Sequence, residues 1–198
     1  MADSKITALT ANTTPLTTDI LPMVDDPAGT PATQKITIAN LLQASTFPAG
    51  AVVQVVYTNS TAVATGTTTV PMDDTIPQIT EGTEFMTLAI TPKSTTNVLD
   101  IHIVALVANS TAGVYNIGAL FQDATANALA GNISYSTNGI TTIITINYTM
   151  VAGTTSATTF RFRAGPSAAG TITFNGVGGS RYLGAITKSS IVIYEHKA

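Results

Sequence analysis

Threonine is the residue that most restricts how this chain can fold, since it fills 37 of the 198 positions and is accompanied by 12 serines. Thr is branched at Cβ and stiff about χ1, so it favours extended strands over helices. Only 10% of the residues are charged, well below the quarter that is usual in globular proteins. The composition therefore predicts an all-β protein.

The few charges and the missing cysteines exclude several classes of partner and chemistry. Eight Lys and Arg stand against 11 Asp and Glu, which leaves no basic field for nucleic-acid phosphates. The absence of cysteine removes disulfides, zinc–thiolate sites and thiol nucleophiles. We therefore expect no nucleic-acid partner, no bound metal and no cofactor.

The N-terminus has no run of seven or more apolar residues, and no stretch approaches the roughly 20 apolar residues of a membrane helix. We expect a protein made in the cytoplasm and not inserted into a membrane. Its mean hydropathy of +0.32 is high for a soluble monomer with so few charges to cover its surface. We interpret this value as apolar surface that is buried against other subunits.

Proline divides the chain into an arm, residues 1–47, and a head domain, residues 48–198. Five of the nine prolines lie in the first 50 residues, where their fixed φ and missing N–H discourage regular sheet. We expect an extended arm with one short helix of about two turns over residues 38–44, capped by Thr37. Such an arm cannot bury its own apolar residues, so we expect them to dock on another protein. The candidate docking residues are Ile20, Leu21, Val24, Ile36, Ile38, Leu41 and Leu42.

From residue 51 onward, alternating or β-branched apolar runs of strand length are separated by Gly, Asn, Ser and Pro. This pattern predicts about ten strands in a jelly-roll β-sandwich. The expected strands are 52–58, 63–70, 85–91, 98–108, 113–122, 129–136, 140–150, 158–163, 171–174 and 183–195.

The expected strand 98–108 has two unlike faces. Period two places Asp100 and His102 on one face, together with Val104 and Leu106. The opposite face is wholly apolar, with Leu99, Ile101, Ile103, Ala105 and Val107. A mixed outer face indicates a sheet that is itself partly covered.

Few residues are candidates for catalysis or metal binding. The acidic pairs Asp25–Asp26 and Asp73–Asp74 have the composition of a cation site or an acid–base pair. Each precedes turn sequence within a few residues and lacks calcium-loop spacing, so we interpret both as turns. His102 and His196 lie on separate expected strands, where they either form a metal pair or a pH switch, or serve structural and solvent roles, which we prefer.

Two arginines alternate with phenylalanines, so Arg161 and Arg163 share one strand face and Phe160 and Phe162 the other. The arginines are solvated, pair with Asp or Glu of a neighbouring subunit, or bind an acidic glycan. Six tyrosines offer stacking platforms for sugars, and equally suit subunit interfaces. They are Tyr57, Tyr115, Tyr135, Tyr148, Tyr182 and Tyr194.

Three segments of the arm resemble the N-terminal module of tailed-phage fibre and virion-attachment proteins. They are KITAL (5–9), LTTDILPMVDD (16–26) and TQKITIANLL (33–42). The head opens with VVQVV (52–56) and closes with GSRY (179–182) and SSIVIYE (189–195). It resembles the jelly-roll heads of phage structural proteins, which are similar to trimeric tumour-necrosis-factor heads. The resemblance implies ten strands in two sheets, three subunits about an axis and an arm that attaches to the virion.

Three functions follow as hypotheses. The first is a non-enzymatic bacteriophage structural protein, located in the virion, whose homotrimeric head decorates the capsid and whose arm docks on other virion proteins. The second is a tail-fibre protein for host attachment that recognises host surface glycans. The third is a virion-associated polysaccharide hydrolase, which requires a carboxylate pair or triad in a cleft, with Asp100 and Glu195 as candidates. We prefer the first and expect no enzymatic activity.

Overall fold

The computed structural model describes residues 14, 16, 18–25, 32–38 and 47–198. The chain divides into two compact units, Met1–Pro48 and Ala49–Ala198, so the division lies one residue beyond the expected boundary. In the described ranges no helix is long and apolar enough to cross a membrane.

The arm contains a small antiparallel sheet that the sequence analysis did not expect. Strand β1 (Ile20–Asp25) pairs with β2 (Ala32–Thr37), with Pro22 opposite Lys35. Proline is tolerated there because each strand of a two-stranded sheet has an edge whose groups need no partner. The sequence predicted an extended arm in which proline discourages regular sheet, and it did not predict this pairing. Of the helix expected over 38–44, only Ile38 is described, and it has helical backbone.

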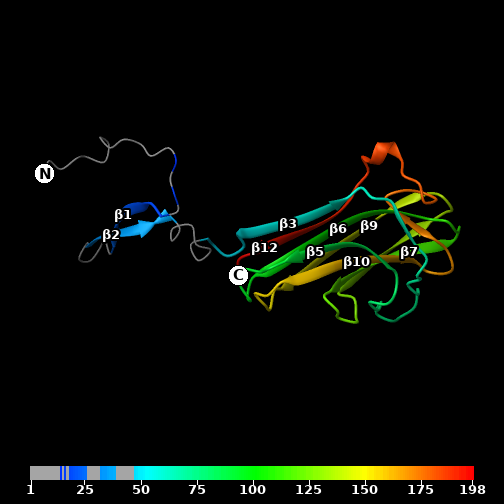
Figure 1. Cartoon of the computed structure of the whole chain (residues 1–198). Helices are drawn as coiled ribbons and strands as arrows, with labels where there is room; N and C mark the ends of the chain where they lie inside the picture. The colour runs from blue at the N-terminus through cyan, green and yellow to red at the C-terminus, as the bar shows by residue number, and fades with distance from the viewer. Residues whose placement is uncertain (1–13, 15, 17, 26–31, 39–46) are drawn as a thin grey trace. The chain divides into compact units, whose positions relative to one another are not determined.

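The head is an all-β sandwich of ten strands, which confirms the predicted fold class (Figure 1). The strands are β3 (Val52–Ser60), β4 (Ala64–Gly66), β5 (Thr83–Ile90), β6 (Val98–Asn109), β7 (Val114–Gln122), β8 (Ala130–Ser136), β9 (Thr141–Val151), β10 (Thr158–Pro166), β11 (Ile172–Phe174) and β12 (Ser189–His196). One sheet has the order β5-β10-β7-β8, and the other the order β3-β12-β6-β11-β4, with β9 also paired to β6. All these pairs are antiparallel, as in a jelly roll.

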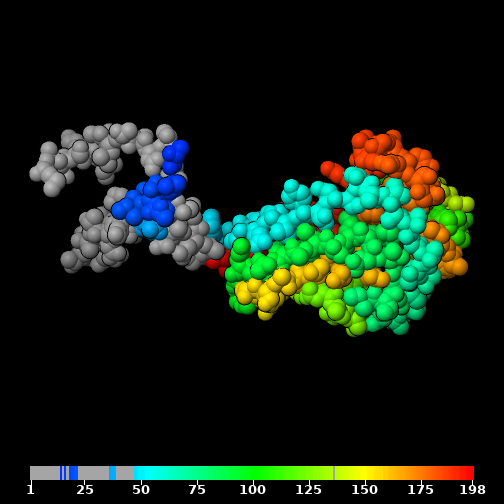
Figure 2. Space-filling model, in the orientation of Figure 1, coloured from blue at the N-terminus to red at the C-terminus, as the bar shows by residue number. Residues whose placement is uncertain are grey.

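Two expected strands are shorter than predicted. The range 63–70 contributes only β4, because its partner β11 offers three residues for pairing. The range 183–195 begins with a short 3-10 turn at Leu183–Ala185, whose three residues have φ of 52°, 60° and 66°. Left-handed backbone cannot continue a strand, so β12 starts at Ser189. The segment 176–188, drawn in orange to red, protrudes from the sandwich (Figures 1 and 2).

Strand β6 provides the centre of the core. Its five predicted inward residues, from Leu99 to Val107 in steps of two, are at most 1% exposed, so the predicted inner face is confirmed. They belong to one cluster with Phe160 and Phe162 of the facing sheet. Gly118 of β7 allows this close packing, because a Cβ there would lie 2.8 Å from both Ile144 Cγ2 and the Phe162 ring.

Glu195 is a fully buried carboxylate that fastens one end of the sandwich. Its Oε1 accepts hydrogen bonds from the Lys93 backbone N–H at 2.7 Å and from Asn97 Nδ2 at 2.6 Å. Both donors belong to the connection between β5 and β6. These hydrogen bonds offset the cost of burying the Glu195 charge. We therefore assign Glu195 a structural role in holding the β5–β6 connection.

Candidate functional site

The outer face of the six-stranded sheet is the most distinctive surface of the head. Side chains in directly opposed positions form rows across it: Val55, Tyr194, Asp100 and Thr149 in one row, and Tyr57, Val192, His102 and Asn147 in the next. Several large apolar side chains on this face are exposed, namely Val55, Tyr57, Val104, Ile143, Val151 and Tyr194. We call this surface the apolar face.

A second exposed apolar patch lies on β8, at the edge of the four-stranded sheet. Ile133 and Tyr135 are about half exposed, at 49% and 55%. The Tyr135 ring lies edge-on to Tyr115 with centroids 5.3 Å apart, and the adjacent Asn132 Nδ2 donates to the Thr145 carbonyl of β9 at 2.8 Å. We call Ile133 and Tyr135 the β8 patch, and it is distinct from the apolar face.

A third feature is a pocket at the end of β6. It has a volume of about 600 Å³ and is bordered by Leu106, Ile140, Val177, Tyr182 and Leu183, among others. Tyr182 and Leu183 are 56% and 70% exposed, so the protruding segment presents apolar side chains over the pocket. Periodicity did not identify this pocket, because it is formed by the non-repetitive segment between β11 and β12.

His102 is the centre of a polar cluster within the apolar face. Its Nε2 lies 2.9 Å from Asp100 Oδ2, and its Nδ1 lies 2.9 Å from Asn147 Oδ1. Thr149 Oγ1 donates to Asp100 Oδ1 at 3.1 Å. The cluster therefore joins β6 to β9 by side-chain contacts in addition to the backbone ladder.

The pKa of Asp100 is set by opposing effects. Partial burial raises it, whereas hydrogen bonds from His102 and Thr149 and the positive charges of His102 and His196 lower it. The lowering effects win, and the pKa of Asp100 lies below its ordinary value of 3.8. The carboxylate is thus ionised at neutral pH and ready to pair with a protonated imidazole.

The two histidines share the apolar face but do not form a metal pair. Tyr194 lies between them, with ring centroids 5.8 Å from His102 and 6.3 Å from His196. In the described part of the chain, no three His, Cys, Asp or Glu side chains gather in a way that would hold a metal ion.

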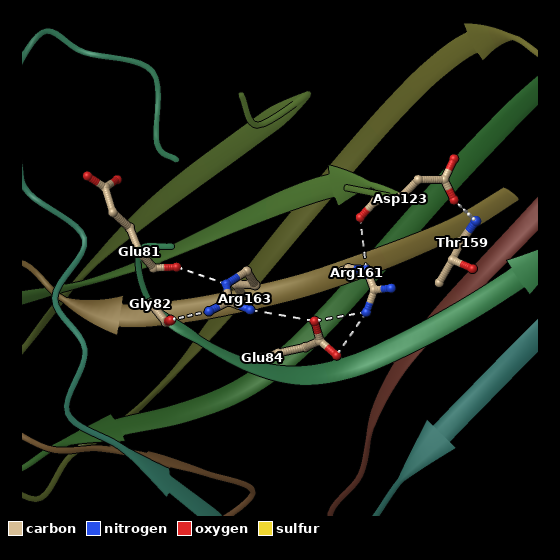
Figure 3. A network of polar contacts seen from close by, with 7 residues as sticks. All are labelled: Glu81, Gly82, Glu84, Asp123, Thr159, Arg161 and Arg163. Carbon is tan, nitrogen blue, oxygen red and sulfur yellow. Dashed lines mark hydrogen bonds and ion pairs between the residues drawn. The ribbon is translucent and has the colours of Figure 1, made fainter. Parts of the chain in front are cut away.

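Arg161 and Arg163 make contacts within their own chain, around Glu84 (Figure 3). Arg161 Nη1 lies 3.1 Å from Glu84 Oε2, and its Nε donates to the Asp123 carbonyl at 3.0 Å. Arg163 Nη1 lies 3.5 Å from Glu84 Oε2, and Arg163 also donates to the carbonyls of Glu81 and Gly82 at 2.9 and 2.8 Å. The carboxylate that pairs with both arginines is Glu84 of the same chain, whereas the prediction placed the pairing carboxylate in a neighbouring subunit.

The candidate hydrolase carboxylates lie on opposite sides of one sheet. Asp100 points outward from β6, whereas Glu195 is buried in the sandwich, with the neighbouring Tyr194 facing Asp100 across the strands. They cannot act on one bond from two sides of a sheet.

The acidic pairs of the sequence are described only in part. Asp73 accepts a hydrogen bond from the Thr75 N–H at 2.9 Å, as expected of a turn residue. The side chains of Asp25 and Asp26 lie outside the described residues.

The docking residues of the arm are described only in part. Ile20 and Leu21 are 56% and 42% exposed, and Leu21 lies opposite Ile36. Ile36 and Ile38 are partly buried. The side chains of Val24, Leu41 and Leu42 lie outside the described residues. The docking role stays a prediction.

Replacing His102 by Gln removes a positive charge from beside Asp100 and leaves only a neutral amide in place of the imidazole. We expect the pKa of Asp100 to rise toward its ordinary value in His102→Gln, measured by a carbon-detected NMR titration of the carboxylates. His196→Gln is the control and should give a smaller rise, because His196 acts on Asp100 through charge alone. An unchanged Asp100 titration in His102→Gln would contradict this account of the cluster.

Arg163 and Arg161 form a matched pair for testing the polar network. Arg163 is the more buried side chain, at 18% against 32% exposure, and it binds two carbonyls. We expect Arg163→Ala to lower the free energy of unfolding by about 1.5–3 kcal/mol, the range for hydrogen bonds from charged groups. Arg161→Ala should cost less, about 0.2–1 kcal/mol, because its ion pair with Glu84 and its single carbonyl contact are more exposed to solvent. Urea denaturation measures both, and equal losses would refute the ranking.

Comparison with solved structures finds matches that are distant in sequence and have TM-scores below 0.5. The tumour-necrosis-factor protein Eiger from S. frugiperda is 9% identical with a TM-score of 0.42, over 71% of this chain and 92% of that one. The infectious bursal disease virus VP2 subviral particle is 13% identical with a TM-score of 0.34, over 96% of this chain and 46% of that one. The enzymatically active domain of bacteriophage CBA120 tailspike protein 4 is 15% identical with a TM-score of 0.28, over 63% and 19%.

No curated protein matches the sequence. A family model does match it, and the match covers residues 55–198, from within β3 through the end of the chain. The matched range contains β4 to β12 and the part of β3 from residue 55 onward, so it covers nearly all of the head. The chain belongs to the Pgp3 C-terminal domain family.

Proposed function

We propose that the protein is a non-enzymatic structural component of a tailed-phage virion. In this proposal the head forms a homotrimer that projects from the particle, and residues 1–47 attach it to other virion proteins. The attribution to phage rests on the resemblance of residues 5–42 to virion-attachment modules, and the family match begins after that segment.

The observation that carries the trimer is the contrast between the two outer faces of the sandwich. The four-stranded sheet presents Arg161, Arg163 and Glu84 in an internal ion-pair network. The six-stranded sheet presents the apolar face, on which several large side chains are about half exposed or more. Contiguous exposed apolar surface of this kind marks an interaction site, so the apolar face is the one that assembly buries.

The arrangement of the patches favours a ring of like subunits. The apolar face and the β8 patch are unlike surfaces of one domain, and contact between two unlike surfaces gives a head-to-tail interface. Such an interface closes into a ring when its rotation permits. Three subunits are the number implied by the resemblance to trimeric jelly-roll heads.

A trimer also strengthens attachment through the arms. Ile20 and Leu21 are exposed in the arm, and one copy of so short a segment buries little surface. Three linked copies raise the effective concentration of each further contact once the first is made. Weak single contacts therefore suffice to hold a head on the virion.

Recognition of a host surface glycan is a second candidate function. Exposed Tyr182 borders the pocket at the end of β6, and tyrosine rings are suitable platforms for sugars. This reading places the trimer at the tail rather than on the capsid, and leaves the mode of assembly unchanged.

A charge placed in the apolar face should separate the subunits. Val104 is 43% exposed at the centre of this face, and a buried unpaired carboxylate is strongly unfavourable. We expect Val104→Asp to be a folded monomer at micromolar concentration, where the unaltered chain is a trimer, by light scattering and circular dichroism. Thr87 is an exposed residue of β5 in the other sheet. Thr87→Asp is the matched control, and this variant should remain trimeric. A monomeric unaltered chain would refute the proposal.

Removing the arm should uncouple attachment from assembly. We expect residues 49–198, the compact head unit, to trimerise but to be missing from purified virions in a complementation experiment. The full chain should be incorporated in the same experiment. Incorporation of the head alone would contradict the docking role of residues 1–47.

A further inference from the structure

We propose that the Asp100–His102 pair makes assembly of the head pH-dependent, with subunits binding more tightly in mild acid than in alkali because a proton is taken up at His102. This inference rests on the proposed function, in which a second copy of the chain covers the apolar face.

The pair is flanked by apolar side chains of β6, β12 and β3, and on its other side by the neutral residues Asn147 and Thr149 of β9. Val104 follows it on β6, Val192 lies opposite His102, and Tyr194 lies opposite Asp100. Val55 extends the Asp100 row on β3. Any subunit surface that covers these residues also covers the pair.

The hydrogen bonds of His102 fit the doubly protonated ring. Both of its nitrogens face oxygen atoms, Asp100 Oδ2 and Asn147 Oδ1, at 2.9 Å. Carboxylate and carbonyl oxygens only accept, so each ring nitrogen must carry a proton in this arrangement. In the neutral state with the proton on Nε2, Nδ1 becomes an acceptor, and the Asn147 amide must rotate by a half turn to present its NH₂ group. The cluster thus has two satisfied states that differ by one proton.

Covering the cluster distinguishes these two states. In the uncovered head the side chains of His102 and Asp100 are 41% and 31% exposed, so water solvates either state. Under a second subunit, neutral His102 leaves the Asp100 carboxylate as a net negative charge. Protonated His102 converts it into an ion pair. An uncompensated buried charge costs far more than a paired one, so covering favours the protonated state.

The direction of the pH effect follows from linkage. Because assembly favours proton uptake, protonation favours assembly to the same extent. Assembly is strongest where His102 is already protonated in the free head, and it weakens as the pH rises through the range in which the assembled head loses that proton.

The neighbouring strands contribute one other imidazole near His102, that of His196. From β12, Tyr194 lies against His102, and His196 lies beyond it at 6.3 Å from Tyr194. From β9, Asn147 and Thr149 are neutral, and from β3 the facing rows hold only valine and tyrosine. His196 is therefore the natural control.

The experiment measures the trimer dissociation constant of the full chain by sedimentation equilibrium at fixed ionic strength. Imidazole changes charge between about pH 5 and pH 8, so the two conditions are about pH 5.5 and about pH 8.5. We expect assembly to be about tenfold or more tighter at the lower pH. His196→Gln should retain this dependence, and His102→Gln should be weak and nearly unchanged between the two conditions.

Asp100→Asn is the most informative variant, because it should reverse the direction in which pH changes the strength of assembly. Protonated His102 then has no carboxylate partner, so acid should weaken assembly and alkali should strengthen it. Circular dichroism at both pH values verifies that each variant is folded. Two results would overturn the proposed pH dependence while leaving the trimer intact. One is an unaltered chain whose trimer dissociation constant is the same at both pH values. The other is a pH dependence that is lost in His196→Gln but kept in His102→Gln. A full chain that stays monomeric at both pH values overturns the proposed function, and the switch with it.

Discussion

Burial of the inner face of β6 against the facing sheet is the interaction on which the rest of this structure depends. Strand β6 pairs with β12 along one edge and with β9 along the other, so its register places the side chains of three strands. Its inward residues pack in one cluster with Phe160 and Phe162. A slip of one residue would turn Asp100 and His102 into the core, which the cost of burying charge forbids.

The same register determines what the outer surface can do. Side chains alternate between the two faces of β6, so each inward apolar residue is followed by an outward one. Asp100, His102 and Val104 therefore lie on the same outer face. On the outer face of the four-stranded sheet the charged side chains pair with one another, since Glu84 forms ion pairs with both Arg161 and Arg163. The apolar face instead carries the Asp100–His102 cluster among exposed apolar side chains. The proposed assembly and its proposed control by pH therefore both depend on the outward-facing residues of β6.

Much of the fold is predictable from local pattern, and the failures share a cause. All ten head strands occur where alternation predicted them, because period two and β-branched composition are properties of each segment. The range 63–70 was shortened by the length of its partner, and the start of 183–195 by left-handed backbone at Leu183–Ala185. The paired strands of the arm were missed because Pro22 argues against a strand only where both edges need partners. Partner length and pairing are not local properties.

The candidate site shows the same division. The sequence alone determined that the head is all-β, that Asp100 and His102 share a face, and that Arg161 and Arg163 share another, because side-chain direction alternates along any strand. Only the tertiary structure decided that Asn147 completes the His102 cluster, that Glu84 pairs with both arginines, and that Asp100 and Glu195 lie on opposite sides of one sheet. The residues concerned lie 45 to 95 positions apart in the chain, and their placement depends on strand order and register, which are fixed by the packing of the whole sandwich rather than by any segment of it.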